Sequence, residues 1–335
     1  MNKRLNVSDF IKRNTAFLAV ILMMIVGASL YGNTFINYKR NLLNVLLSAS
    51  MLGIMGTGVN MCFLIGARDL SVGAVAAAAA ASMFSAFASP YGLAASLAAG
   101  LVCGGLFGLL NGIVVAKFKV QPFIATLGTQ LAARGVALLV NNELSKEIAD
   151  TALALKNMGN GNIFGLIPVP AVIFIVLLVV LTLVLGYTHF GRSVYAIGGN
   201  EEAAAMMGVQ VDKVKTLVFV LSGLTSGLTG VILSGHINAG QPTSFVGWEM
   251  TIMAAIVIGG TSTTGGVGKI TGIFFGVIFL QLITNIINLN GSISPYWKDV
   301  ITGAILLGAV LIQRFTERRG ELAALRVNVE GGAAK

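Results

Sequence analysis

The closest approach to a nucleotide-binding motif in this sequence is the glycine-rich stretch Gly259–Gly268, which is followed by Lys269. A phosphate-binding loop of the GxxxxGK(S/T) type needs backbone N–H groups around the phosphates, a lysine, and a Ser or Thr hydroxyl that holds Mg²⁺. Ile270 follows the lysine here, so the metal-binding hydroxyl is missing. The chain is therefore not expected to bind ATP through such a loop.

Residues for metal or acid–base chemistry are scarce. The chain has 2 histidines and 2 cysteines, and it contains no HExxH or CxxC pattern. Cys62 and Cys103 both lie within apolar runs, where free buried thiols are the expected state. We therefore expect neither an enzyme nor a metal ion or other cofactor.

The most informative polar stretch begins at Asn200 and ends at Gly208. Asn200 is a favoured residue for capping a helix, and Glu201 and Glu202 follow in the first turn, where the helix dipole favours acids. Gly208 suits the left-handed conformation that ends a helix. The remaining positions are Ala and Met, and Met is favoured at adaptable protein interfaces, whereas a membrane-surface helix would carry basic residues. The pattern predicts a short helix that contacts a protein partner, with a helix lying on the membrane as the alternative.

The elements that position this stretch follow from an extreme composition. Hydrophobic residues make up 56% of the chain and charged residues 10%, with a mean hydropathy of +0.86. A soluble domain carries about 25% charged residues, so this chain is expected to lie in a membrane. The net charge of +9 is therefore interpreted through its placement along the chain, and no nucleic-acid partner is expected. The 42 glycines allow helix backbones to approach closely in lipid.

Apolar runs of about 20 residues mark candidate membrane-spanning helices, and ten are predicted. They cover about Thr15–Tyr31, Leu42–Ile65, Leu70–Ala88, Leu93–Ala116, Pro122–Val140, Ile163–Tyr187, Val214–Leu233, Trp248–Ile258, Ile270–Ile287 and Tyr296–Ile312.

The distribution of basic residues predicts the orientation. With the N-terminus in the cytoplasm, 16 of the 22 Lys and Arg residues fall in cytoplasmic segments and 5 in outer segments, while Arg134 lies in a span. This bias follows the positive-inside rule, which predicts that both termini are cytoplasmic. The first span is expected to be retained, because no clear small-x-small cleavage site follows it. The predicted fold is an all-α polytopic membrane protein with interrupted helices, a single transmembrane domain over residues 1–335, a cytoplasmic loop at 188–214 and a cytoplasmic tail at 314–335.

Two polar, glycine-rich segments interrupt the apolar pattern, namely Gly66–Gly73 and Gly259–Gly268. Non-helical backbone at membrane depth is tolerated where it is buried in protein or lines a cavity. For the second segment, a plain turn between two helices is as good an explanation as a segment that lines a cavity. For the first, the favoured explanation is structural: Asp69 or Ser71 caps the next helix, or Asp69 pairs with Arg68.

Four segments share a pattern that is specific when they occur together and in this order. They are Asp69–Gly73, Gln121–Gly128, Asn200–Gly208 with its Glu-Ala-Ala core, and Gly259–Gly268. Nearly the whole chain resembles the permeases of ribose/galactose/arabinose/xylose-type ABC importers in bacteria, within the branched-chain amino acid/ribose permease superfamily. One departure is Ile65-Gly66-Ala67-Arg68 before Asp69, where that family usually has a stretch resembling GGIDLSVG.

The resemblance implies the inner-membrane permease subunit of an ATP-driven importer for a monosaccharide, a pentose or a hexose. Its implied partners are an ABC ATPase subunit, a periplasmic sugar-binding protein, a second permease copy or paralogue, and the lipid bilayer. In the family, the short cytoplasmic helix docks on the ATPase. By this resemblance, the residues expected to dock on the ATPase are Gly199, Asn200, Glu201, Glu202, Ala203, Ala204, Met206, Met207 and Gly208.

A path for a neutral sugar needs hydroxyl, amide and aromatic groups. The candidates are Asn60, Asp69, Ser71, Gln121, Thr126, Gln130, Gln241 and Trp248. For each of them, a hydrogen bond between helices is the alternative role.

Two other functions compete with ATP-driven import. An ion-coupled secondary transporter of a small polar solute would place ionisable residues in the membrane, and Asp69, Glu249 and Arg134 are the residues available for this. It would leave the acidic loop helix unexplained. A structural membrane subunit without a pathway is disfavoured by the interrupted helices.

Overall fold

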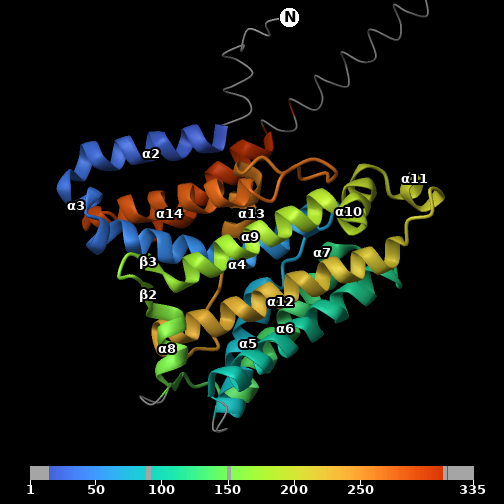
Figure 1. The fold of residues 1–335 in the computed structure, drawn as a ribbon, viewed down its shortest axis with the longest axis horizontal. Coiled ribbons are helices and arrows are strands. Elements are labelled where there is room, and N and C mark those ends of the chain that lie inside the picture. The colour runs from blue at the N-terminus through green and yellow to red at the C-terminus, as the bar shows by residue number, and fades with distance from the viewer. Residues whose placement is uncertain (1–14, 88–91, 149–151, 312–314, 316–335) are drawn as a thin grey trace, which may run out of the picture.

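Long helices that lie side by side make up most of the computed structural model, which describes residues 15–87, 92–148, 152–311 and 315 (Figure 1). The helices are α2 (Thr15–Tyr31), α3 (Asn33–Ile36), a π-helix (Tyr38–Leu42), α4 (Leu43–Leu64), α5 (Val72–Phe87), α6 (Gly92–Ala116), α7 (Pro122–Asn141), α8 (Leu153–Asn160), α9 (Val169–Tyr187), α10 (His189–Gly199), α11 (Glu201–Met206), α12 (Val211–Ile237), α13 (Trp248–Ile258) and α14 (Gly272–Asn290). Residues 297–311 form a further helix.

Six of the described helices are long and apolar enough to cross a membrane, and three shorter apolar helices accompany them. Helix occurs within each of the ten predicted ranges, so the prediction of a helical, polytopic membrane protein is confirmed. The number of crossings and the cytoplasmic termini remain predictions. Residues 1–14, and the predicted tail at 314–335 apart from residue 315, lie outside the described residues.

The predicted start of the sixth span is wrong. Asn162–Ile163 (β2) pairs with Ile167–Pro168 (β3) in an antiparallel hairpin, and α9 begins only at Val169. Pro168 fixes its own φ and lacks an N–H group, which favours a helix start just after it. Helices α8 and α10, in the predicted loops on either side of α9, were not expected from the hydropathy pattern because both are short and amphipathic.

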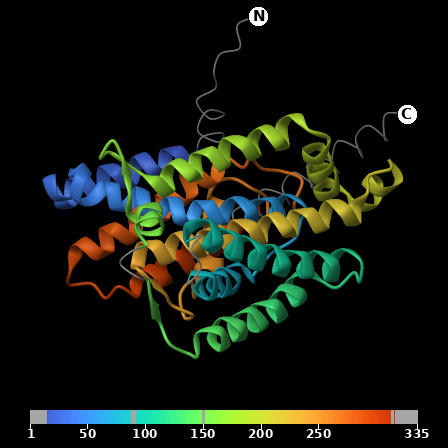
Figure 2. The ribbon, with the colours of Figure 1, turned by 60° about the horizontal axis from the view of Figure 1, so that its bottom comes forward.

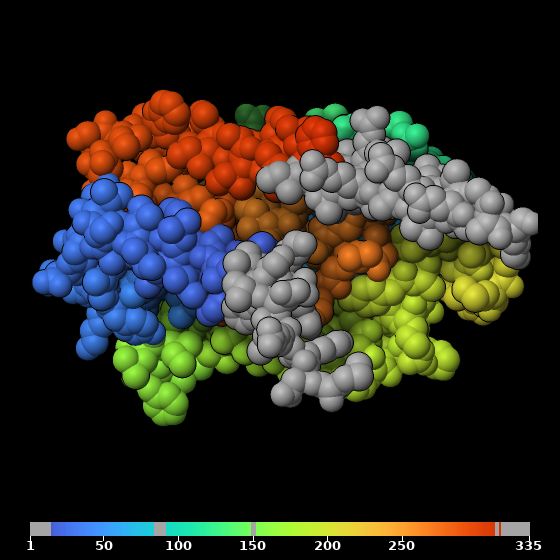
Figure 3. Space-filling model, turned by 90° about the horizontal axis from the view of Figure 1, so that it is seen from above, coloured from blue at the N-terminus to red at the C-terminus, as the bar shows by residue number. Residues whose placement is uncertain are grey.

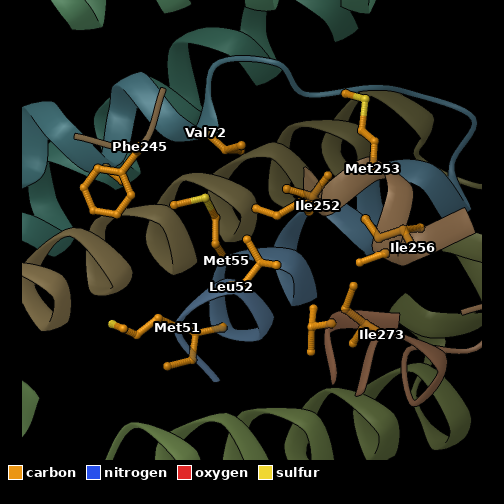
Figure 4. Close-up of a cluster of buried hydrophobic side chains, with 14 of the residues drawn as sticks. Met51, Leu52, Met55, Val72, Phe245, Ile252, Met253, Ile256 and Ile273 are labelled. Atoms are coloured by element: carbon orange, nitrogen blue, oxygen red, sulfur yellow. The ribbon is translucent and has the colours of Figure 1, made fainter. Parts of the chain in front are cut away.

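Helix α4 lies at the centre of the bundle. Its side chains Met51, Leu52 and Met55 are buried in one cluster with Ile252 of α13 and Ile273 of α14 (Figure 4). Such close packing supplies dispersion contacts, which replace the hydrophobic effect as the force between helices in lipid. The buried position of α4 determines where its C-terminal end, and the interruption that follows it, lie in the molecule.

Helices α6 and α12 pack through glycines at intervals of four residues. A Cβ atom added at Gly104 would lie 2.2 Å from the carbonyl oxygen of Gly223, and one added at Gly223 would lie 2.1 Å from that of Gly104. Gly108 and Gly227 make similar backbone contacts one turn away on each helix. The expectation that small residues permit close helix approach is confirmed for this pair.

The elongated bundle has two distinct ends. Helices α10 and α11 project at one of them, which we call the α11 end (Figures 1 and 2). Figure 3 shows α11 in yellow at the far right of the surface. The other end, which we call the α8 end, carries α3, α8 and the β2–β3 hairpin, together with the pairing of Lys146–Glu147 (β1) with Ala239–Gly240 (β4).

Candidate functional site

Helix α11 forms as its sequence predicts. Asn200 has extended backbone angles, φ −160° and ψ 110°, and its side-chain oxygen accepts a hydrogen bond of 2.9 Å from the N–H of Ala203. Glu201 and Glu202 occupy the first turn. Gly208 ends the segment with φ +85°. The prediction of a short, capped, acidic helix is confirmed.

One side of α11 is anchored to the bundle and the other is exposed. Ala204 is buried among apolar residues that include Val211 and Phe219 of α12, and Glu201 forms an ion pair with Lys215. On the opposite side, Met206 and Met207 are 83% and 74% exposed. The exposed side also contains Glu202 and Ala205. We call these four residues the α11 face: it is an acidic, methionine-rich surface on a fixed support.

Helix α10 connects α11 to the membrane-spanning bundle. The Thr188 hydroxyl accepts a 3.2 Å hydrogen bond from the N–H of Gly191 and so caps the helix. The Tyr195 hydroxyl donates a 3.0 Å hydrogen bond to the carbonyl of Gly268, in the loop between α13 and α14. Burial raises the pKa of Tyr195, which keeps this hydroxyl protonated and able to donate.

The end of α10 is in direct backbone contact with the end of α4. A Cβ atom added at Gly198 would lie 1.8 Å from the carbonyl oxygen of Leu64 and 2.4 Å from the amide nitrogen of Gly266. The N–H of Gly266 in turn donates a 2.9 Å hydrogen bond to that same Leu64 carbonyl, and Gly265 packs against the backbone of Gly66. We call this meeting point, formed by Leu64, Gly66, Gly198, Gly265 and Gly266, the glycine junction. It joins α10 to both interrupted segments.

Directly after the glycine junction, the carboxylate of Asp69 is buried and surrounded by neutral donors. One of its oxygens accepts hydrogen bonds from the backbone N–H and the hydroxyl of Ser71, at 3.0 and 2.6 Å, and the other accepts one from Ser222 of α12 at 2.8 Å. The amide of Asn111 on α6 donates to the Ser71 hydroxyl at 2.9 Å. Asp69 therefore ties the start of α5 to α12.

The predicted pairing of Asp69 with Arg68 is wrong: Asp69 instead accepts a hydrogen bond from the N–H of Ser71, the residue just before α5. The Arg68 guanidinium is directed away and donates a hydrogen bond of 3.4 Å to the carbonyl of Thr263 at the exposed surface. Asp69 is 1% exposed, so a neighbouring arginine would have to lose its hydration to reach it. Hydroxyl and N–H donors satisfy the carboxylate without burying a second charge.

A second polar cluster holds α7 against the segment that precedes α13. Gln130 donates a 3.2 Å hydrogen bond to Glu249, which lies in the first turn of α13 as predicted. The Arg134 guanidinium donates to the carbonyl oxygens of Pro242 and Ser244, the latter at 2.8 Å. These bonds give Arg134 a structural role that its position in an apolar run did not reveal.

The residues predicted to line a path do not converge on one channel. Asp69 and Ser71 belong to the first cluster and Gln130 to the second. Thr126 and Asn60 are fully buried; Thr126 donates to the carbonyl of Pro122 at 2.8 Å, and Asn60 to that of Lys269 at 3.5 Å. Gln121 and Gln241 are exposed, and Trp248 borders a cavity at the α8 end.

Sequence reasoning missed Ser222, Lys215 and Gly198. Each is an ordinary residue within its own helix and gains its contact only from a distant segment, so the sequence around it carries no signal.

Comparisons with known proteins match this architecture over most of the chain. Residues 41–310 match the model of the family described as branched-chain amino acid transport system / permease component. The chain is 35% identical over 312 residues to the ribose import permease protein RbsC of Bacillus subtilis, covering 93% of this chain and 96% of that protein. It is 37% identical over 289 residues to the L-arabinose transport system permease protein AraH of Escherichia coli, covering 85% and 84%. No solved structure matches it.

Proposed function

Because the chain belongs to the branched-chain amino acid transport system / permease component family, we propose that it is the permease subunit of an ATP-driven monosaccharide importer in a bacterial inner membrane. The observation that carries the proposal is its similarity, over 93% and 85% of its length, to a ribose import permease and an L-arabinose transport permease. The solute would be a pentose or a hexose, delivered by a periplasmic binding protein.

The α11 end would face the cytoplasm. Lys119 and Asp212 form a 2.7 Å ion pair there, and Arg192, Lys213 and Lys215 lie on the neighbouring helices α10 and α12. The density of basic residues at this end supports the orientation through the positive-inside rule. Both termini would then be cytoplasmic, and an ATPase subunit would have access to α11.

The α11 face would be the docking surface for that ATPase. Methionine side chains adapt their shape to an apolar groove, and Glu202 has no ion-pair partner among the described residues, which leaves it available to a basic group of the partner. Ala204 and Glu201, on the anchored side, would fix the position of α11 relative to the bundle.

Replacing Met206 with aspartate is expected to reduce co-purification of the ATPase subunit at least about tenfold, because it places a charge in the centre of an apolar contact. A matched control is Phe164→Asp, in the β2–β3 turn at the α8 end, where an apolar side chain is 93% exposed. This control should leave co-purification unchanged. Equal recovery of the ATPase with both variants would contradict docking on the α11 face.

Motion of the ATPase subunits would reach the membrane through the glycine junction. Backbone contact leaves no flexible side chain between α10 and Leu64, so a displacement of α11 has to move the end of α4 or the Gly265–Gly266 turn. The Asp69 cluster follows within a few residues. A second permease copy or paralogue would present its own α11 to the other ATPase subunit, and the pair would alternate between outward and inward openings.

The function is tested by reconstituting the permease, its ATPase subunit and its binding protein in proteoliposomes. We expect uptake of labelled ribose or arabinose only when ATP is supplied on the side of the membrane that carries the ATPase subunit. We expect no uptake when the ATPase carries a substitution that blocks hydrolysis. Intact complexes that hydrolyse ATP but accumulate no monosaccharide would contradict the proposal.

One observation favours the second candidate, ion-coupled transport: Asp69 is a buried carboxyl without a basic partner among the described residues, and such residues serve as proton relays in carriers. In the same proteoliposomes, a protonophore added at constant ATP separates the two candidates. Uptake that persists supports ATP-driven import, whereas uptake that collapses would establish the ion-coupled alternative.

A further inference from the structure

A cavity of about 320 Å³, with apolar walls from Met51, Leu52, Leu233 and Val246 beside its polar groups, opens at the α8 end, between α4, α12, α13, α14 and the helix at 297–311. Its polar lining side chains are Ser48, His236, Trp248, Thr251, Gln281, Thr284, Lys298, Asp299 and Thr302. Apart from Trp248, none of them belongs to the residues predicted to form a path.

The wall of this cavity contains hydrogen-bonding groups that the protein leaves unused. Gln281 lies in the middle of α14, a helix long and apolar enough to span the membrane. No hydrogen bond joins its side chain, the indole N–H of Trp248 or the Ser48 hydroxyl to any other described residue. An amide without a partner in lipid is strongly unfavourable, so these groups require water or a polar solute in the cavity.

The type of solute follows from the side chains. Gln281 both donates and accepts hydrogen bonds, Ser48 and Thr302 contribute hydroxyls, and Trp248 provides a flat apolar surface with one N–H group. Lys298 and Asp299 carry charges of opposite sign, and both residues lie at the exposed rim of the cavity. The wall therefore suits a neutral molecule with several hydroxyl groups, and the volume is at the small end of the 300–1,000 Å³ typical of ligand sites.

We propose that this cavity binds the transported monosaccharide within a single permease subunit, on the side where the binding protein releases it. The inference rests on the proposed function, which supplies the solute and the direction of transport. The sugar would hydrogen-bond Gln281 and lie against Trp248, with Thr284 one turn closer to the α8 end. The buried carboxylate of Asp69 and the half-buried carboxylate of Glu249 belong to separate clusters and take no part in this site.

Access to the cavity can be tested without transport. In the assembled importer, Gln281→Cys is expected to react with a charged, membrane-impermeant methanethiosulfonate above the background of Cys62 and Cys103, and saturating ribose or arabinose should slow that reaction at least about threefold. Thr182→Cys on α9, which packs outside the cavity, should remain unlabelled. Absence of labelling at 281, or labelling that neither sugar slows, would overturn the site.

Transport supplies the second measurement. Gln281→Ala and Thr284→Val should each lower maximal uptake, at saturating loaded binding protein, by about five- to tenfold, the effect of losing one or two neutral hydrogen bonds. Thr182→Val is the matched control: its hydroxyl bonds the Leu178 carbonyl at 2.6 Å, just as that of Thr284 bonds Leu280 at 3.0 Å. The control should transport normally, and ATPase co-purification and Tm should not change in any variant.

The outcomes distinguish a failure of the proposed function from a failure of the cavity site. If the wild-type importer moves no monosaccharide with ATP, the proposed function fails, whatever the variants do. If the wild type transports but the Gln281 and Thr284 variants match Thr182→Val, with no protection by sugar, the cavity site is wrong and the proposed function is unaffected.

Discussion

Replacing Gly198 with alanine is expected to lower ATP-driven sugar uptake by about 10- to 100-fold. The added Cβ would lie 1.8 Å from the Leu64 carbonyl oxygen and 2.4 Å from the Gly266 nitrogen, both of them backbone atoms that cannot rotate away. Overpacking of this kind costs about 1–3 kcal/mol. The strain falls where the backbone of α10 contacts the end of α4, so it should separate ATP hydrolysis from transport.

A glycine outside the docking segment provides a control. A Cβ added at Gly186 of α9 meets nothing within 4 Å, and its φ is not positive, so Gly186→Ala should transport normally. Uptake and ATPase activity are measured on the same proteoliposomes. We expect Gly198→Ala to retain the ATPase subunit, because the α11 face is unchanged, and to lose most of the uptake per ATP hydrolysed. Normal coupling in this variant would show that the glycine junction does not transmit the motion.

Replacing Asp69 with alanine is expected to destabilise the permease by at least about 3 kcal/mol, since each buried donor left without an acceptor costs about 1–3 kcal/mol. Three donors would lose their acceptor, namely the N–H and hydroxyl of Ser71 and the hydroxyl of Ser222. Thermal unfolding of the purified protein in detergent should show a drop of several degrees in Tm. Asp212→Ala is the control, because that carboxylate is half exposed in a surface ion pair with Lys119 and contributes at most about 1 kcal/mol.

The Asp69→Asn variant distinguishes a structural role from proton coupling. Its amide oxygen still accepts a hydrogen bond, so we expect smaller destabilisation than in the alanine variant and ATP-driven uptake that persists at a substantial fraction of wild type. A carrier that used Asp69 as a proton relay would instead lose transport completely, because an amide does not titrate. Complete loss of uptake in an Asn variant of normal stability would therefore contradict the structural role.

Local features of the chain were predictable from sequence because their causes lie within a few residues. Hydropathy over about 20 residues marks a span wherever the rest of the chain lies. The cap of α11 joins Asn200 to Ala203, and its termination depends on the conformational freedom of Gly208. The predicted boundary of a span was wrong where a short element interrupts the apolar pattern, as at the β2–β3 hairpin before Val169.

Tertiary structure alone decided which polar groups meet. Arg68 was the nearest cation to Asp69 along the chain, yet the carboxylate is bound by Ser222, 153 residues later. Gly198 has no room for a side chain because α10 ends against Leu64, and Gln281 faces a cavity because four neighbouring segments leave space there. By itself, the sequence determined a membrane permease with a short capped helix at α11, since hydropathy and capping act locally. The glycine junction and the cavity depend on the rotation and separation of packed helices, which no local pattern contains.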